Sequence, residues 1–133
     1  IETARFGDRL RLIIDVPEEM MDKKVPVFVL QPIVENAVKH GILPKPEGGE
    51  VYLKAFFEDG EIRFCVRDTG VGMDQKRLKE VLTKWPGIGL KNVNERLKLL
   101  YGEDHGLDIK TSVNNGTKVS FSISMREVSS VDG

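Results

Sequence analysis

Hydrophobic and polar residues alternate with two different periods along the chain, and these periods separate helices from strands. Between residues 26 and 40 the apolar positions recur at intervals of three and four, the spacing of one face of an α-helix. These positions are Leu30, Ile33, Val34, Ala37 and Val38. Pro32 interrupts the pattern, so either the regular helix begins there or the helix kinks there. We expect Gly41 to take the left-handed conformation that commonly ends a helix.

Two further segments have helical spacing. The segment "QKRLKEVL", residues 75–82, predicts a short helix, and "IGLKNVNERLKLLY", residues 88–101, predicts a longer amphipathic helix that stops at Gly102. The residues expected to face the core from the longer helix are Leu90, Val93, Leu97 and Leu100. The opening segment "IETARFGDRL" is predicted to be the end of a longer helix that runs into the domain.

Strands are predicted where apolar and polar residues alternate with a period of two. Residues 9–16, "RLRLIIDV", predict one strand. Residues 50–68 predict two strands joined by the turn "EDGE", and residues 107–125 predict a second hairpin around the turn "NNG". In the strand that ends at residue 68, one face carries Ile62, Phe64 and Val66, and the other carries Arg63, Cys65 and Arg67.

The order of these elements favours the α+β class. Hairpins with helices grouped between them indicate a mixed, mainly antiparallel sheet covered by helices on one face, which is a two-layer α/β sandwich. A chain of 133 residues is long enough for one domain with a substantial core. We expect this domain to span residues 1–125, followed by a polar tail at residues 126–133.

Composition narrows the classes of function. The chain has 20 basic and 21 acidic residues, so it lacks the basic excess typical of a nucleic-acid-binding protein. The longest apolar run, "VPVFVL", is too short to cross a bilayer, and no direct membrane contact is expected. The single cysteine, Cys65, excludes an internal disulfide, and its place in a strand predicts a buried, unreactive thiol. These features favour a cytoplasmic setting.

The first candidate site lies in "LQPIVENAVKHG", residues 30–41. Its polar side carries Gln31, Glu35, Asn36, Lys39 and His40. The simplest interpretation is a solvated face, on which Glu35 pairs with Lys39 and His40 has no function. Asparagine, however, is a mediocre helix former, and its side-chain oxygen suits a hard cation such as Mg²⁺. A lysine nearby can neutralise phosphate.

The second candidate site is "RDTGVGM", residues 67–73, which directly follows a strand. Gly70 and Gly72 permit unusual backbone angles and close approach of a ligand. The Asp68 carboxylate only accepts hydrogen bonds, so it suits the exocyclic amine of adenine and disfavours guanine. A calcium loop is excluded because glycines occupy positions that would need oxygen ligands. A plain turn after the strand is the remaining alternative.

The third candidate site is "GIGLKN", residues 87–92. It differs from a dinucleotide-binding fingerprint because Asn92 stands where the third glycine should be, and the strand–helix–strand context is missing. What remains is a glycine pair before a helix N-terminus, whose free N–H groups attract phosphate. A purely steric need for glycine explains the motif equally well.

These three sites occur in this order over residues 30–92, and together they resemble the ATP-binding domain of sensor histidine kinases, which belong to the GHKL (Bergerat-fold) superfamily. The stretch "LQPIVENAVKHG" is similar to the N box, "DTGVGM" to the first glycine box, and "GIGLKNVNERLKLLYG" to the second. The residues of the three boxes, with "ARFGDRL" upstream, most resemble those of LytS-type sensor kinases. The resemblance covers residues 1–125, nearly the whole chain.

The resemblance implies a role for each matching residue. Asn36 would ligate Mg²⁺ that bridges the ATP phosphates, and Lys39 and His40 would lie near those phosphates. Asp68 would bind the adenine amine with help from Thr117. Simpler alternatives are that Thr117 favours a strand and that His40 fills the end of its helix. His105 has no counterpart in the resemblance and is expected in a loop. The other implied ATP-binding residues, in the purine pocket and at the hinge of the lid, are Gly70, Gly72, Met73, Gly87, Ile88, Gly89 and Leu90.

Two features depart from the wider superfamily. The ATPases and serine kinases of the superfamily resemble one another in carrying an acidic residue four positions before the N-box asparagine. In this chain Pro32 occupies that position. Glu35 is the nearest acid, and we assign it to catalysis together with Asn36. The lid is short and lacks an "F-x-P-F" segment, and Trp85–Pro86 is either a stiff anchor for it or part of the core.

The resemblance therefore implies a protein histidine kinase domain that binds Mg²⁺ and ATP. It would donate the γ-phosphoryl group to a histidine on a dimerisation and phosphoacceptor domain upstream of Ile1, for relay to the receiver domain of a response regulator. The isolated domain is expected to bind ATP with little turnover. Two alternatives are a degenerate, non-catalytic regulatory module and a GHKL serine kinase or ATPase, which Pro32 disfavours. Whether the parent is an integral membrane protein stays open.

Overall fold

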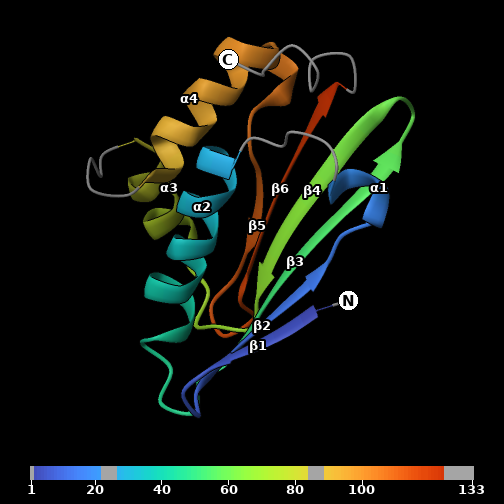
Figure 1. The fold of residues 1–133 in the computed structure, drawn as a ribbon. Coiled ribbons are helices and arrows are strands. Elements are labelled where there is room, and N and C mark those ends of the chain that lie inside the picture. The colour runs from blue at the N-terminus through green and yellow to red at the C-terminus, as the bar shows by residue number, and fades with distance from the viewer. Residues whose placement is uncertain (1, 22–26, 84–88, 125–133) are drawn as a thin grey trace.

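The computed structural model describes residues 2–21, 27–83 and 89–124 (Figure 1). Its strands are β1 (Glu2–Phe6), β2 (Leu10–Asp15), β3 (Gly49–Glu58), β4 (Glu61–Asp68), β5 (Asp108–Thr111) and β6 (Thr117–Ser124). Its helices are α1 (Glu18–Met21), α2 (Val27–Asn36), α3 (Gln75–Thr83) and α4 (Gly89–Tyr101), with a π-helical turn η1 (Ala37–Ile42) and a short 3-10 helix η2 (Glu103–His105).

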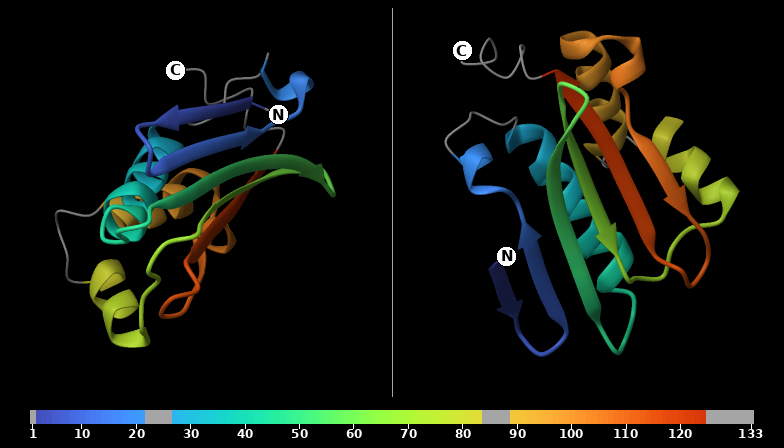
Figure 2. Two further views of the ribbon diagram at one scale, coloured as in Figure 1. Left: turned by 90° about the horizontal axis from the view of Figure 1, so that it is seen from below. Right: turned by 90° about the vertical axis from the view of Figure 1, so that its right-hand side faces the viewer.

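The strands form one mixed sheet in the order β1-β2-β3-β4-β6-β5. Only β2 and β3 are parallel among these paired strands, and the connection between them runs through α2 and η1, as a parallel pair requires. Helices α2, α3 and α4 cover one face of the sheet, and the opposite face is open (Figures 1 and 2). The predicted α+β sandwich with a mainly antiparallel sheet is confirmed.

No helix in the described ranges combines the length and the apolar character needed to cross a bilayer.

The core lies between the sheet and the helix layer. The alternation predicted for β4 is confirmed, because Ile62, Phe64 and Val66 are all buried. Opposite Phe64, β6 contributes Phe121, and the two rings stack with their centroids 5.0 Å apart. The two-residue turn Asp59–Gly60 between β3 and β4 has positive φ angles of 50° and 79°, which suit the twist of a hairpin.

The first residues form a strand, so the predicted N-terminal helix is wrong. Strand β1 pairs antiparallel with β2, from Glu2 opposite Ile14 to Phe6 opposite Leu10. Every residue of β1 is exposed, so the strand is held by backbone hydrogen bonds to its neighbour and not by a buried face. A segment without a buried face shows no apolar period that would distinguish strand from helix.

The structure decides the position of Pro32 and corrects the prediction for Gly41. Helix α2 includes Val27, so Pro32 lies inside the helix, and the alternative in which the regular helix begins at Pro32 is excluded. Gly41 is not a left-handed cap but part of η1, which ends at Ile42; the N–H of the C-cap residue Leu43 donates to the Val38 carbonyl oxygen over 2.9 Å. The helix continues through Gly41 because this glycine packs against the end of β4, as described below.

Three smaller predictions need correction. Leu100 is 46% exposed, and Tyr101 faces the core in its place at 7%. Cys65 is half-buried on the open face of the sheet and not fully buried. His105, expected in a loop, belongs to η2, and its Nδ1 lies 2.6 Å from the Ser122 carbonyl oxygen on β6.

Leu97 and Leu99 on α4 offer a matched test of this packing, because Leu97 is fully buried and Leu99 is 86% exposed. We expect Leu97→Ala to lower the free energy of unfolding by about 2–5 kcal/mol through cavity formation. Leu99→Ala should change it by less than about 0.5 kcal/mol. Urea denaturation of both variants measures the difference. Similar losses in the two variants would contradict the orientation of α4.

Candidate functional site

Asp68 is the last residue of β4 and the centre of the candidate site. Its side chain is 3% exposed, although it carries a carboxyl group. The backbone N–H of Gly70 donates to Oδ1 over 2.8 Å. Asp68 stands opposite Thr117 in the register of β4 and β6, and Thr117 is buried beside it. The predicted pair of Asp68 and Thr117 is therefore adjacent in the fold.

Burial raises the pKa of Asp68 above its ordinary value of 3.8, because ionisation in a poorly solvated place is costly. Backbone N–H groups of Gly70 and Thr117, followed by the charges of Arg67 and Lys45, offset part of this effect. Lys45 was not predicted from the sequence; its Nζ donates to the Thr69 carbonyl oxygen over 2.8 Å. A buried carboxylate of this kind is typical of a site that binds a hydrogen-bond donor.

The N-box helix meets the first glycine box at Asp68. The N–H of Val71 donates to the Gly41 carbonyl oxygen over 3.0 Å. A Cβ on Gly41 would lie 2.8 Å from Oδ1 of Asp68, and a Cβ on Gly70 would collide with the Gly41 carbonyl group. Gly41 is thus required to leave room for the Asp68 carboxyl group, and Gly70 is required because its backbone meets the backbone of Gly41. Two of the three predicted segments converge here.

The hairpin of β5 and β6 holds the first glycine box from the other side. The N–H of Asn114 donates to the Val71 carbonyl oxygen over 2.7 Å, and the N–H of Met73 donates to Oγ1 of Thr111 over 2.9 Å. Gly72 has φ +67°, and the Ser112 carbonyl group occupies the space a side chain would need. Thr111, which sequence reasoning missed, also contacts Thr117 through their hydroxyls at 2.8 Å.

Asn36, the last residue of α2, has an unusual side chain. Its Oδ1 atom is buried and has no hydrogen-bond partner among the described residues. An unsatisfied amide oxygen costs free energy unless a ligand binds it, and a hard cation such as Mg²⁺ fits this atom. The described residues contain no group of three His, Cys, Asp or Glu that could hold a metal by itself. A hard cation bound at this atom would therefore need further oxygen ligands from outside such a cluster, such as water or phosphate oxygens.

Positive charge gathers near the N-box end. Lys39 is exposed and His40 is half-buried in η1. Burial lowers the pKa of His40, and the charges of Arg77 on α3 and of Lys39 lower it further. Arg77 was not predicted, and the signal that could have found it is the pair of basic residues at the start of the predicted helix 75–82. Asp74 positions this turn by accepting a hydrogen bond from the Arg77 N–H over 2.8 Å.

Glu35 lies on the solvent side of α2. Its Oε1 accepts a hydrogen bond from Nε2 of Gln31 over 3.0 Å. A solvated face would favour an ion pair between Glu35 and Lys39. Among the described residues, these two side chains do not form one. Glu35 is next to Asn36 in sequence, but its side chain is exposed, so the assignment of Glu35 to catalysis stays a hypothesis.

The third segment is described only in part. Trp85, Pro86, Gly87 and Ile88 lie outside the described residues. Gly89 is the first residue of α4, and Leu90 is fully buried. Helix α4 packs against α2 on the same face of the sheet (Figure 1). The start of α4 is therefore anchored in the core of the helix layer that carries Asn36.

Comparison with known proteins defines the class to which this fold and site belong. Residues 21–127 match the model of the histidine kinase-, DNA gyrase B- and HSP90-like ATPase family, so the chain belongs to this family of ATP-binding domains. The histidine kinase domain of a blue-light activated histidine kinase from Erythrobacter litoralis has the same fold. Its TM-score is 0.67 at 19% identity, over 94% of this chain and 55% of that chain.

Similar curated proteins include sensor kinases. Sensor histidine kinase YpdA of Escherichia coli (strain K12) is 44% identical over 126 residues, and sensor protein LytS of Bacillus anthracis is 36% identical over 129 residues. Each alignment covers 92% of this chain and 22% of the relative. The chain thus corresponds to less than a quarter of those proteins and is homologous to their histidine-kinase-type ATPase domain. The predicted resemblance to LytS-type kinases is confirmed.

The raised pKa of Asp68 predicts how stability depends on pH. As pH rises above 3.8, the unfolded chain loses the Asp68 proton before the folded protein does. The free energy of unfolding therefore falls as the pH rises from the unfolded to the folded pKa of Asp68, and this loss of stability persists at higher pH. We expect the free energy of unfolding of Asp68→Asn, relative to the natural protein, to increase between pH 4 and pH 7. Chemical denaturation across this range measures it. A difference that is constant or decreases with pH would contradict the burial of the carboxylate.

Proposed function

We propose that this chain is the catalytic domain of a sensor histidine kinase, acting in the cytoplasm. It binds Mg²⁺ and ATP and donates the γ-phosphoryl group to a histidine on the phosphoacceptor domain of the same parent protein. The phosphoryl group then passes to the receiver domain of a response regulator. The observation that carries the proposal is the convergence of the N-box helix and the first glycine box on the buried Asp68.

Base recognition in this proposal belongs to Asp68 and Thr117. The Asp68 carboxylate accepts a hydrogen bond from the exocyclic amine of adenine, and the adjacent Thr117 assists. Gly70, Gly72 and Met73 line the pocket, in a loop that the β5–β6 hairpin already holds in place. Because guanine offers a carbonyl oxygen where adenine has its amine, ATP is preferred over GTP.

The phosphates lie toward Asn36 in this proposal. Mg²⁺, when bound, neutralises phosphate charge and orients the γ-phosphoryl group. Asn36 ligates it through the unpartnered Oδ1, while Lys39, His40 and the newly found Arg77 surround the phosphates. By the resemblance, Gly87 and Gly89 would be the hinge of the lid, and Ile88 and Leu90 would belong to the same box; Gly87 and Ile88 lie outside the described residues. Burial, and then the positive charges of Arg77 and Lys39, lower the pKa of His40.

Phosphoryl transfer requires positioning and charge neutralisation more than covalent help from the protein. Glu35 is the acid nearest to Asn36 and is the proposed partner of Asn36 in catalysis. Pro32 stands at the position where related ATPases carry an acidic residue, and a proline cannot activate a water molecule. Hydrolysis of ATP by the isolated domain is therefore slow. The relatives at 44% and 36% identity are sensor kinases, which favours a histidine acceptor over the serine kinase alternative.

Calorimetric titration with ATP tests the nucleotide site. We expect Asp68→Ala to weaken ATP about ten- to a hundred-fold, which corresponds to about 1.5–3 kcal/mol for the lost charged hydrogen bond. Asn36→Ala should remove the Mg²⁺ dependence of binding and leave the fold intact. Asp104→Ala, at an exposed position on η2, is the control and should bind as the natural protein does. Unchanged affinity in both site variants would refute the assignment.

The phosphotransfer step needs a separate test, because nucleotide binding alone also suits a regulatory module. The chain is extended upstream to include the acceptor segment of the parent and incubated with radiolabelled ATP. We expect label that is lost in acid and retained in alkali, as phosphohistidine requires. Binding without such label would favour the non-catalytic module, and acid-stable label would favour a serine kinase.

A further inference from the structure

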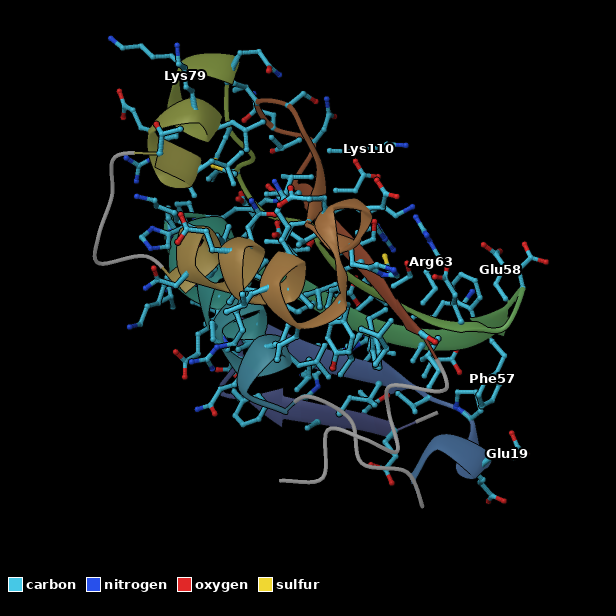
Figure 3. All side chains as sticks on the ribbon, turned by 90° about the horizontal axis from the view of Figure 1, so that it is seen from above. Glu19, Phe57, Glu58, Arg63, Lys79 and Lys110 are labelled. Atoms are coloured by element: carbon cyan, nitrogen blue, oxygen red, sulfur yellow. The ribbon has the colours of Figure 1, made fainter. Side chains whose placement is uncertain are left out.

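A row of three cations crosses the open face of the sheet. Lys110 on β5 stands opposite Lys118 on β6, and Lys118 stands opposite Arg67 on β4. Neighbouring strands lie about 4.8 Å apart, and like charges directly opposite each other destabilise a sheet. In Figure 3, Lys110 projects away from α3 and α4. This arrangement costs stability unless an anion neutralises it.

The protein itself supplies little compensation for this basic row. Within the described ranges, none of the three side chains forms an ion pair with a carboxylate. The Arg67 guanidinium lies over the ring of Tyr52, with Cζ 4.3 Å from the ring centroid. This cation–π contact does not neutralise the charge of Arg67 as a carboxylate would. Elsewhere on the same face, Arg11 has a carboxylate partner in Glu50, at 3.0 Å. The basic row therefore differs from Arg11, whose charge is paired within the protein.

The row borders a cavity of about 290 Å³. The lining residues are Arg67, Lys110, Thr111, Ser112, Asn115, Gly116, Thr117 and Lys118. Apart from the cations, the wall offers polar groups of the hairpin turn. Nδ2 of Asn115 donates to Oγ of Ser112 over 2.7 Å, which leaves the Ser112 hydroxyl proton free to donate to a ligand. Cations and hydroxyl donors around one cavity are the groups that bind phosphate.

We propose that this cavity is a binding site for the phosphate group of a small molecule. Lys110, Lys118 and Arg67 would neutralise its charge, and Ser112 would donate a hydrogen bond. The cavity shares Thr117 with the proposed adenine site, but its lining does not include Asp68, Asn36 or Lys39. The proposal does not depend on the proposed function, because it stands on the register of the cations and on the cavity.

Phosphate titration followed by amide chemical shifts tests the site. The natural chain is titrated with inorganic phosphate and with phenyl phosphate, in the presence of saturating ADP to occupy the nucleotide site. We expect saturable shifts at Ser112, Asn115, Gly116 and Lys118. Equal affinity for the two probes identifies the free anion as the ligand, and a clear preference for phenyl phosphate identifies an organic phosphomonoester; either result supports the site.

Neutralising variants separate this site from general surface charge. Lys110→Gln and Lys118→Gln should each weaken phosphate about ten-fold, as expected for a lost charged contact. They should also raise the melting temperature at low salt, because like-charge repulsion in the row is relieved. Lys54→Gln is the matched control, an exposed cation on the same face that lies 5.6 Å from the Phe56 ring centroid.

Three outcomes would overturn the proposal. These are shifts that do not saturate, shifts confined to residues 36–41, and an equal loss of phosphate affinity in Lys54→Gln. None of them bears on ATP binding, which is tested by Asp68→Ala and Asn36→Ala. If the natural chain does not bind ATP but binds phosphate in the absence of ADP, the proposed function is refuted and the phosphate site is still supported.

Discussion

The contact between Gly41 and the end of β4 is the constraint on which the site depends. Without a side chain on Gly41 or Gly70, the N-box helix approaches the sheet until their backbones touch, and the Val71 N–H reaches the Gly41 carbonyl oxygen. This approach buries the Asp68 carboxyl group and brings Asn36 to the same end of the sheet. A larger residue at either glycine would separate the two layers at the point where they must meet.

The site is built at a cost to stability. Burial disfavours the ionised form of Asp68, burial and the neighbouring charges disfavour protonation of His40, and Oδ1 of Asn36 has no partner among the described residues. In the proposed function, a purine, a phosphate and a cation would offset these costs on binding. Such local conflicts with stability are expected at functional sites. They support a nucleotide site more directly than any single motif does.

The hairpin of β5 and β6 links two surfaces of the domain. Toward the helices, Thr111 and Asn114 hold the loop that contains Gly72 and Met73. On the open face, the same hairpin carries Lys110 and borders the basic cavity. If a phosphate binds there as we propose, it contacts the segment that supports the adenine pocket. The two sites are therefore connected through a short, continuous piece of backbone.

The sequence by itself determined the features that depend on local spacing. The alternation of Ile62, Phe64 and Val66 predicted the buried face of β4, and the three boxes predicted the class of site. It could not decide β1, whose residues have no buried face and depend on pairing with β2. It also placed Gly41 in a cap, because its true role is a contact with residues 68–71, far away in the sequence. Arg77 and Thr111 entered the site for the same reason: periodicity identifies elements, but only packing decides which distant side chains meet.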